Sequence, residues 1–259
     1  MDLGLNGKQA IVCASTRGLG YACAEALARE GCDVVLNGRD RDRAAAAAEK
    51  LRAVAAGQVS LVTGDVSAAS TREALLACCP APDILINNNG GPSPGAFMSY
   101  DEAQWSQALQ DNMIVPLLLV RSVLPGMRAR KFGRIVNITS AMVTTPRPHM
   151  TLSAGARAGL TAALKGLSLE VARDNVTINN LLPERFDTER QIFMAKQAAT
   201  RESISYDEAR AKQVESIAAK RLGDPAEFGA LCAFLCSRYG GFISGQNFHL
   251  DGGSYPALI

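Results

Sequence analysis

Short apolar segments rich in β-branched residues recur along the chain, and longer segments with helical periodicity lie between them. The apolar segments do not alternate strictly with polar residues, which is typical of strands covered on both faces. The expected strands are residues 9–14, 33–37, 59–63, 83–87, 134–139, 177–182 and 247–250. The expected helices are residues 19–30, 41–55, 70–78, 101–129, 152–173 and 224–237. This alternation predicts an α/β fold with a single Rossmann-type, doubly wound parallel sheet and helices on both faces.

The chain of 259 residues has no linker rich in Pro, Gly or Ser and no second apolar core, so we expect a single domain over residues 1–259. The longest interruption of the pattern is the charged stretch 184–222, which precedes a helix start at Asp224 and Pro225. Ligands bind outside the carboxyl ends of the strands in such sheets. We therefore expect a substrate lid at about 186–222. The alternative is a pair of solvated surface helices.

The segment after the first expected strand reads CASTRGLGYACAEALAREG. Gly18 and Gly20 permit a tight turn and a close approach of the backbone to a phosphate, and the helix that begins there points its free N–H groups at the same place. An acidic residue that binds the ribose of NAD would follow about 20 residues later. Arg39 stands at that position, and Arg17 lies inside the loop. These two cations predict a dinucleotide-binding domain that prefers NADP(H) to NAD(H).

Composition excludes several other classes of function. The formal net charge is +2 and no basic run is interleaved with aromatic residues, so a nucleic-acid partner is not expected. Seven scattered cysteines and two histidines in different segments give no metal signature, and we expect reduced thiols in a cytoplasmic protein. There is no signal-peptide pattern, and no apolar run reaches the roughly 20 residues that span a bilayer, so no membrane association is expected.

Seven motifs, in the same order and over nearly the whole chain, resemble those of the short-chain dehydrogenase/reductase family. Its glycine loop, T-G-x-x-x-G-x-G, appears as Cys13-Ala14-x-x-x-Gly18-x-Gly20. The first glycine is an alanine here, which is tolerable if φ at Ala14 is negative. The other matches are Asp65 in GDVS, Asn87 to Gly90 in NNNG, Asn112 in WSQALQDNMIVPLLL, Ser140 at the end of GRIVNITS, Pro183 and Thr188 in VTINNLLPERFDT, and the segment ISGQNFHLDGGS. Glu184 replaces the glycine of the family's P-G-x-x-x-T segment.

The resemblance implies an NADP(H)-dependent oxidoreductase that acts on a small molecule, either a small carbonyl compound or alcohol or a 3-oxoacyl-like substrate. It also implies a homotetramer or homodimer formed through the helices at 101–129 and 152–173, where residues 154–163 are rich in small side chains. The residues expected to bind the cofactor are Ser15, Arg17, Gly18, Leu19, Gly20, Arg39, Asp65, Val66, Asn88, Gly90, Arg157, Pro183 and Thr188.

The family's catalytic signature, Y-x-x-x-K, is altered in this chain. The tyrosine of the family follows the serine by thirteen residues; thirteen residues after Ser140 is Ser153, and four further is Arg157. In the family's mechanism the lysine lowers the pKa of the tyrosine and holds the nicotinamide ribose, and the tyrosine transfers the proton. Arg157 keeps the positive charge but does not relay a proton. A serine hydroxyl is a much weaker acid and ends several ångströms short of a tyrosine oxygen.

We therefore expect an atypical proton donor. The candidates are His149, Tyr206 in the expected lid, and a water molecule held by Ser140, Ser153 and Asn112. The expected catalytic residues are Ser140, Ser153, Arg157, Asn112 and His149. Two alternatives stay open: a catalytically impaired NADP(H)-binding protein with a regulatory role, and a non-redox enzyme in the same cleft.

Overall fold

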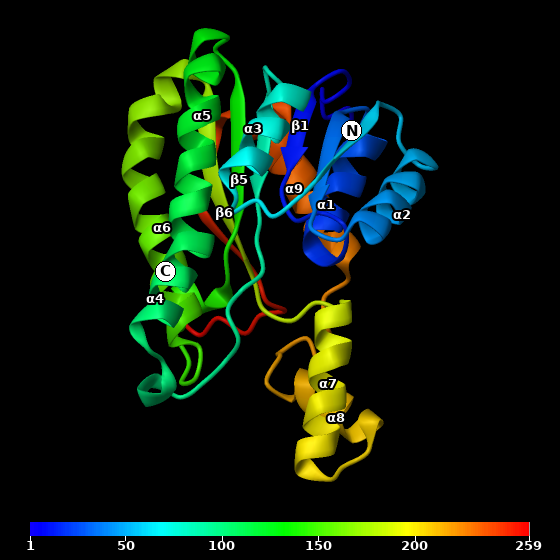
Figure 1. Cartoon of the computed structure of the whole chain (residues 1–259), viewed down its shortest axis with the longest axis vertical. Helices are drawn as coiled ribbons and strands as arrows, with labels where there is room; N and C mark the ends of the chain where they lie inside the picture. The colour runs from blue at the N-terminus through cyan, green and yellow to red at the C-terminus, as the bar shows by residue number, and fades with distance from the viewer. Residues whose placement is uncertain (259) are drawn as a thin grey trace.

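In the computed structural model, which describes residues 1–258, one seven-stranded parallel sheet carries helices on both faces (Figure 1). The strand order is β3-β2-β1-β4-β5-β6-β7. The strands are β1 (Gln9–Val12), β2 (Asp33–Gly38), β3 (Val59–Thr63), β4 (Ile84–Asn87), β5 (Gly133–Ile138), β6 (Val176–Pro183) and β7 (Asn247–Leu250). The order reverses between β1 and β4, which creates the switch point where ligands bind in doubly wound sheets. The predicted fold class is confirmed.

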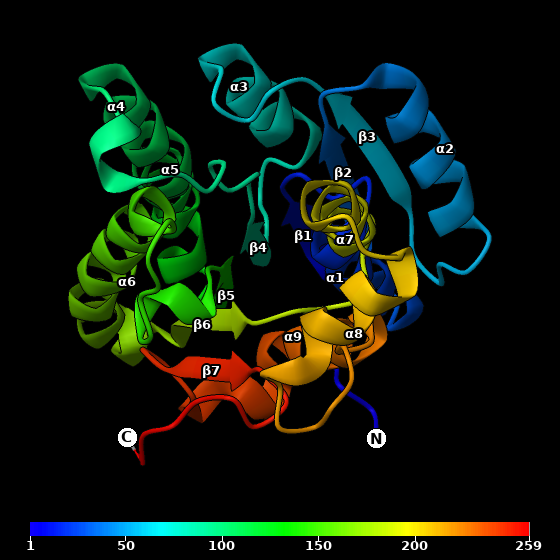
Figure 2. The same cartoon turned by 90° about the horizontal axis from the view of Figure 1, so that it is seen from below.

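Alternate residues of the strands enter two separate apolar cores. Val12 and Ile86 pack on one face with α1 (Gly18–Arg29), α2 (Arg41–Arg52) and α9 (Pro225–Cys236). Ile11 and Leu85 pack on the other with α3 (Ala69–Cys78), α5 (Val115–Ala129) and α6 (Thr151–Val171). The view along the sheet shows the two helical layers (Figure 2). Because both faces are covered, the strands read as nearly continuous apolar runs.

The helix expected over 101–129 contains a change of hydrogen-bonding pattern. It comprises α4 (Glu102–Leu109), a π-helical turn at Gln110–Ile114 and α5. Asp101 begins α4 with a capping box, because its side chain accepts from the backbone of Gln104 and the Gln104 side chain accepts in return. π-helical turns are frequent at functional sites. This turn contains Asn112.

The charged stretch after β6 forms two helices that project beyond the carboxyl ends of the strands (Figure 1). They are α7 (Glu189–Glu202) and α8 (Tyr206–Glu215). Glu202 and Lys212 join them through an ion pair of 2.9 Å. The chain then enters α9 through the expected N-cap, Asp224, which forms a capping box with Glu227. Within residues 1–258 no helix has the length and apolarity to cross a bilayer.

Candidate functional site

The start of α1 lies very close to the carboxyl ends of β1 and β4. A Cβ atom at Gly20 would lie 2.6 Å from the carbonyl oxygen of Ala14 and 2.6 Å from the Nδ2 of Asn88. That amide donates to the same carbonyl at 3.0 Å. Gly18 has a φ of +56°, which glycine adopts without strain. The two glycines thus form the backbone cradle that their spacing predicted, with the N-terminus of α1 directed into it.

Ala14 does not meet the condition under which an alanine is tolerable in place of the glycine, because its φ is positive, at +45°. The neighbouring strands hold this strained backbone, because the Ala14 amide donates to the Oδ1 of Asn37 at 3.1 Å. The Ser15 side chain turns inward as well, where its hydroxyl donates to the carbonyl of Val12 and accepts from the amide of Asn37. The backbone at Ala14 therefore has the left-handed conformation that glycine adopts easily, and this conformation is unfavourable for alanine.

Both arginines expected at the 2′-phosphate face a carboxylate. Arg39 follows β2, and its Nη1 lies 3.6 Å from the Oδ2 of Asp65, which follows β3. Arg17 forms an ion pair of 2.9 Å with Glu189 in the first turn of α7. All four side chains are exposed, so these pairs are weak and can be exchanged for a bound anion. Val66, beside Asp65, is buried.

Arg157 places a buried positive charge in the site. Its guanidinium is buried and donates to the carbonyls of Ile138 at 2.6 Å, Thr139 at 3.1 Å and Asn89 at 3.3 Å. Burial, and secondly the charge of Arg190, lower its pKa to about 10. The group therefore stays charged at neutral pH. Its hydrogen bonds fix it between the ends of β4 and β5, and Nε and one Nη2 hydrogen are left free to donate.

Ser140, Ser153 and Asn112 surround this region with polar groups. Ser140 caps the 3₁₀ turn Ala141–Val143, accepting from the Met142 amide at 3.2 Å and keeping its own proton free. Ser153 is buried in the first turn of α6. Asn112 donates to the carbonyl of Ala108, but its Oδ1 is buried without a partner in the described chain. A buried acceptor without a protein partner is a typical position for an ordered water molecule.

The two side chains proposed as substitute acids lie at the surface. His149 is exposed with a φ of +64°, and it contributes its carbonyl, which accepts from the Gly95 amide at 2.9 Å. Tyr206 begins α8 and is 39% exposed. No hydrogen bond brings either side chain to Ser140 or Ser153 in the region that the structure describes.

Two features of the site were missed in the sequence. The Glu184 carboxylate, 5% exposed, accepts from Arg147 at 2.9 Å and lies 3.6 Å from Arg185. In the sequence, the only sign of this carboxylate was that Glu184 replaces the glycine of the family's P-G-x-x-x-T segment. At the C-terminal end, the ring of His249 stacks on Tyr255, and its Nε2 lies 3.4 Å from the Oγ1 of Thr144 in the segment after Ser140.

The sequence is similar to those of many known oxidoreductases. A family model described as enoyl-(acyl carrier protein) reductase matches residues 13–255. A 3-oxoacyl-[acyl-carrier-protein] reductase of Vibrio harveyi is 32% identical over 253 residues, which cover 98% of this chain and 99% of that protein. Dehydrogenase/reductase SDR family member 4 of Bos taurus is also 32% identical, over 98% of this chain and 89% of that protein.

A solved structure gives the same picture at the level of the fold. L-sorbose reductase from Gluconobacter frateurii, complexed with NADPH and L-sorbose, superposes with a TM-score of 0.94. The two chains are 29% identical, and the match covers all of both. That neighbour was solved with a nicotinamide dinucleotide bound.

Proposed function

The chain belongs to the short-chain dehydrogenase/reductase family, and we propose that it is an NADP(H)-dependent oxidoreductase that reduces a carbonyl group with an atypical proton donor. The substrate class is a small carbonyl compound or a 3-oxoacyl thioester, as in the names of the relatives. The observation that carries the proposal is Arg157, a buried cation fixed at the position of the family's lysine. A protein with no use for that charge would gain by replacing it with an apolar side chain, because burying an unpaired cation is costly.

The residues that would hold the cofactor follow from the cradle. The N-terminus of α1, with Gly18 and Gly20, would bind the pyrophosphate, and Arg39 would bind the 2′-phosphate. Asn88, Gly90 and the segment from Pro183 to Thr188 would line the nicotinamide half. Gly20 contributes through its lack of a side chain, because the carbonyl oxygen of Ala14 and the amide of Asn88 pack where a Cβ atom would lie and keep the start of α1 close to β1. When bound, NADPH supplies the hydride. The remaining expected contacts, Ser15, Leu19, Asp65 and Val66, lie at the ends of β1 to β3 or at the start of α1.

The chain's own residues would then manage the charge and the proton. Arg157 would direct its free N–H groups toward the nicotinamide ribose and stabilise negative charge on the substrate oxygen. The hydroxyls of Ser140 and Ser153, with the free Oδ1 of Asn112, would hold a water molecule. That water would give a proton to the substrate oxygen in place of the absent tyrosine, and the hydroxide that remains would take up a proton from solvent water. A serine at 153 suits this role, because it leaves the space that a phenol ring would fill.

The test is NADPH oxidation by the purified protein with a panel of 3-oxoacyl thioesters and hydroxyketones, beside a direct measurement of NADPH affinity. Turnover above the buffer rate supports the proposal. Tight NADPH binding with no turnover on any substrate instead supports the alternative, a regulatory nucleotide-binding protein. The observation that favours this alternative is that neither exposed side chain, His149 or Tyr206, reaches the serines.

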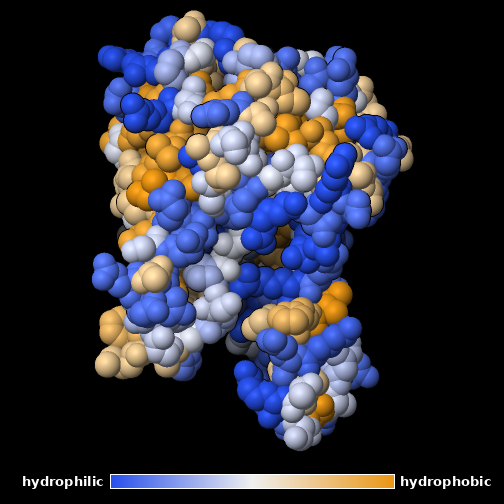
Figure 3. Space-filling view, viewed as in Figure 1, coloured by the Kyte–Doolittle hydropathy of each residue, from blue (hydrophilic) through white to orange (hydrophobic). Residues whose placement is uncertain are grey.

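We also propose that α7 and α8 form a lid over the substrate, within one domain of residues 1–259. The first turn of α7 lies against the glycine loop, since a Cβ at Gly18 would be 3.8 Å from the Cγ2 of Thr188. A hollow separates the rest of the segment from the body of the molecule (Figure 3). The ion pair of Arg17 with Glu189 bridges the two parts. These contacts support a segment that opens and closes at the cofactor site.

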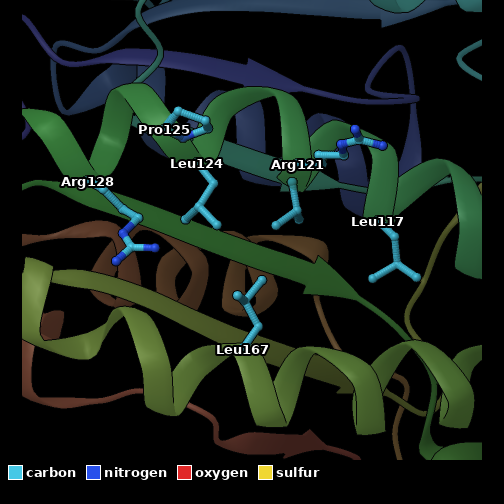
Figure 4. A pocket seen from close by; sticks show the side chains of 7 residues that line it. Leu117, Arg121, Leu124, Pro125, Arg128 and Leu167 are labelled. Atoms are coloured by element: carbon cyan, nitrogen blue, oxygen red, sulfur yellow. The ribbon is translucent and has the colours of Figure 1, made fainter.

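A homodimer or homotetramer through α5 and α6 is the assembly that we propose. Apolar side chains gather over these helices (Figure 3), and a groove runs between them (Figure 4). The groove is lined by Leu117, Val120, Arg121, Leu124, Pro125, Arg128 and Leu167. Leu169, on the same helix as Leu167, is 73% exposed. Among the small residues of α6, Gly155, Ala162 and Ala163 are exposed, while Gly159 lies against Met113 of the same chain.

A further inference from the structure

Two arginines from different parts of the fold approach one backbone position. A Cβ atom at Gly91 would lie 3.6 Å from the Nη2 of Arg157 and 3.7 Å from the Nη1 of Arg190. Arg157 comes from α6 and Arg190 from the first turn of α7. Gly91 follows the NNNG segment at the end of β4. The two guanidinium groups therefore flank the loop that borders the nicotinamide half of the proposed site.

Neither cation has a carboxylate partner among residues 1–258. The hydrogen bonds of Arg157 all go to carbonyl oxygens, and Arg190 makes neither an ion pair nor a hydrogen bond. The neighbouring Glu189 is engaged by Arg17 instead. Two like charges that face each other, one of them buried, are unfavourable without a counter-ion. The arrangement favours a bound anion between them.

The position of α7 identifies this anion. Thr188 lies beside Gly18, where an added Cβ atom would be 3.8 Å from its Cγ2, and Glu189 pairs with Arg17 in the same loop. Arg190 follows directly, and the end view places α7 over the ends of the strands around β1 (Figure 2). The glycine loop and the N-terminus of α1 form the site for a pyrophosphate. A group that enters this cradle and extends to Gly91 carries its phosphates between the loop and Arg190.

We propose that Arg190 binds the pyrophosphate of NADP(H) and that this contact holds α7 against the glycine loop. Arg157 supplies the second positive charge on the nicotinamide side. The inference rests on the proposed function for the identity of the cofactor but not for the reaction. Cofactor binding and closure of the α7–α8 segment are then one event, because the residue that completes the phosphate site is part of the moving segment.

The variant Arg190→Gln tests the contact, with Lys196→Gln as its matched control on the same helix. Lys196 is exposed, and its substitution removes the same charge from α7. We expect R190Q to weaken NADPH binding by about tenfold to a hundredfold in a fluorescence or calorimetric titration, as for a lost charge-assisted contact. We expect K196Q to change the Kd less than about twofold and R190K to recover part of the loss. Equal affinities of R190Q and the unaltered protein would overturn the proposal.

A second ligand and a second measurement show whether R190Q weakens binding at the pyrophosphate or elsewhere. Adenosine 2′-phosphate carries the adenine end without a pyrophosphate, so R190Q should bind it as tightly as the unaltered protein does. Equal weakening of both ligands would place the defect elsewhere and overturn the assignment. Hydrogen exchange should show that NADP⁺ protects Glu189–Glu202 in the unaltered protein and in K196Q, but not in R190Q. A protein that binds NADPH but reduces nothing defeats the proposed function and leaves this inference intact.

Discussion

The side chains of Arg17 and Glu189 form an ion pair of 2.9 Å that joins the glycine loop to the first turn of α7. A nucleotide phosphate must compete with Glu189 for Arg17. We expect Glu189→Gln to tighten NADPH binding by about two- to fivefold, because exposed ion pairs are worth about 0.2–1 kcal/mol. The measurement is the Kd for NADPH at low ionic strength, where such pairs are strongest.

The matched control for this substitution is Glu25→Gln. Glu25 pairs with Arg29 at 2.7 Å on α1, in a pair that is also partly exposed. The E25Q substitution should leave the Kd for NADPH unchanged. Weaker binding of NADPH by E189Q would show that Glu189 supports the cofactor site instead of competing with it.

Ala14→Gly is expected to stabilise the protein, because Ala14 is held at a φ of +45°. Relief of a left-handed alanine contributes about 1 kcal/mol to the free energy of unfolding. Chemical denaturation measures the change. Ala172→Gly is the control, since Ala172 is exposed, has a helical φ of −56° and gains nothing from the extra freedom. If A14G is no more stable than A172G, the loop is not strained at this position.

Arg39→Asp should abolish or reverse the preference for NADP(H). The substitution places a second carboxylate beside Asp65, which Arg39 now faces at 3.6 Å, and would repel a 2′-phosphate. The ratio of the Kd values for NADPH and NADH checks this. Arg43→Asp makes the same charge change within α2, four residues after Arg39. It should leave the ratio of the two Kd values unchanged. Equal affinities for the two dinucleotides before any substitution would contradict the proposed cofactor.

The contact between α7 and α8 should weaken in acid. Hydrogen bonds from Arg201 and then Lys212 lower the pKa of Glu202 from its ordinary 4.5 to about 2. A carboxyl whose pKa is lower in the folded state stabilises that state above its ordinary pKa. This stabilisation is lost as the pH falls from 4.5 through about 2. Hydrogen-exchange protection of α7 and α8 should fall over this range.

Two variants separate this effect from general acid unfolding. Glu202→Gln should start with lower protection near neutral pH and lose less of it in acid. Glu215→Gln, at an exposed position of α8, should follow the unaltered protein. A pH dependence in E202Q as steep as in the unaltered protein would assign the effect to another group.

The sequence was a good guide to whatever depends on local pattern. Strand and helix periodicity predicted the alternation of strands and helices along the chain and the parallel sheet, and the spacing of Gly18 and Gly20 predicted the tight turn before α1. Asp224 began its helix as expected. The φ of Ala14 could not be predicted, because it depends on tertiary hydrogen bonds: its amide donates to Asn37 and its carbonyl accepts from Asn88.

Features that depend on how distant segments pack could not be predicted from the sequence. The approach of Arg190 to Arg157 follows from the placement of α7 over the glycine loop, which no periodicity encodes. The same holds for Glu184, whose pairing with Arg147 joins two loops. Contacts within the chain at the small residues of α6 could not be predicted either, because Gly159 lies against Met113 and Gly155 lies beside Trp105. The expected contact between subunits at these residues stays a prediction.

The central claim is that a water molecule held at Asn112 replaces the missing tyrosine in carbonyl reduction. The most direct test is a single-turnover measurement of NADPH oxidation by a 3-oxoacyl thioester or a hydroxyketone, comparing the unaltered protein with Asn112→Ala. Gln107→Ala, which removes an exposed amide from α4, is the control. The account predicts turnover in the unaltered protein and in Q107A, and a loss of about a hundredfold in N112A, in line with the loss of general acid catalysis, at unchanged NADPH affinity. Turnover by N112A at the rate of the unaltered protein, or no NADPH oxidation by any of the three proteins, would contradict it.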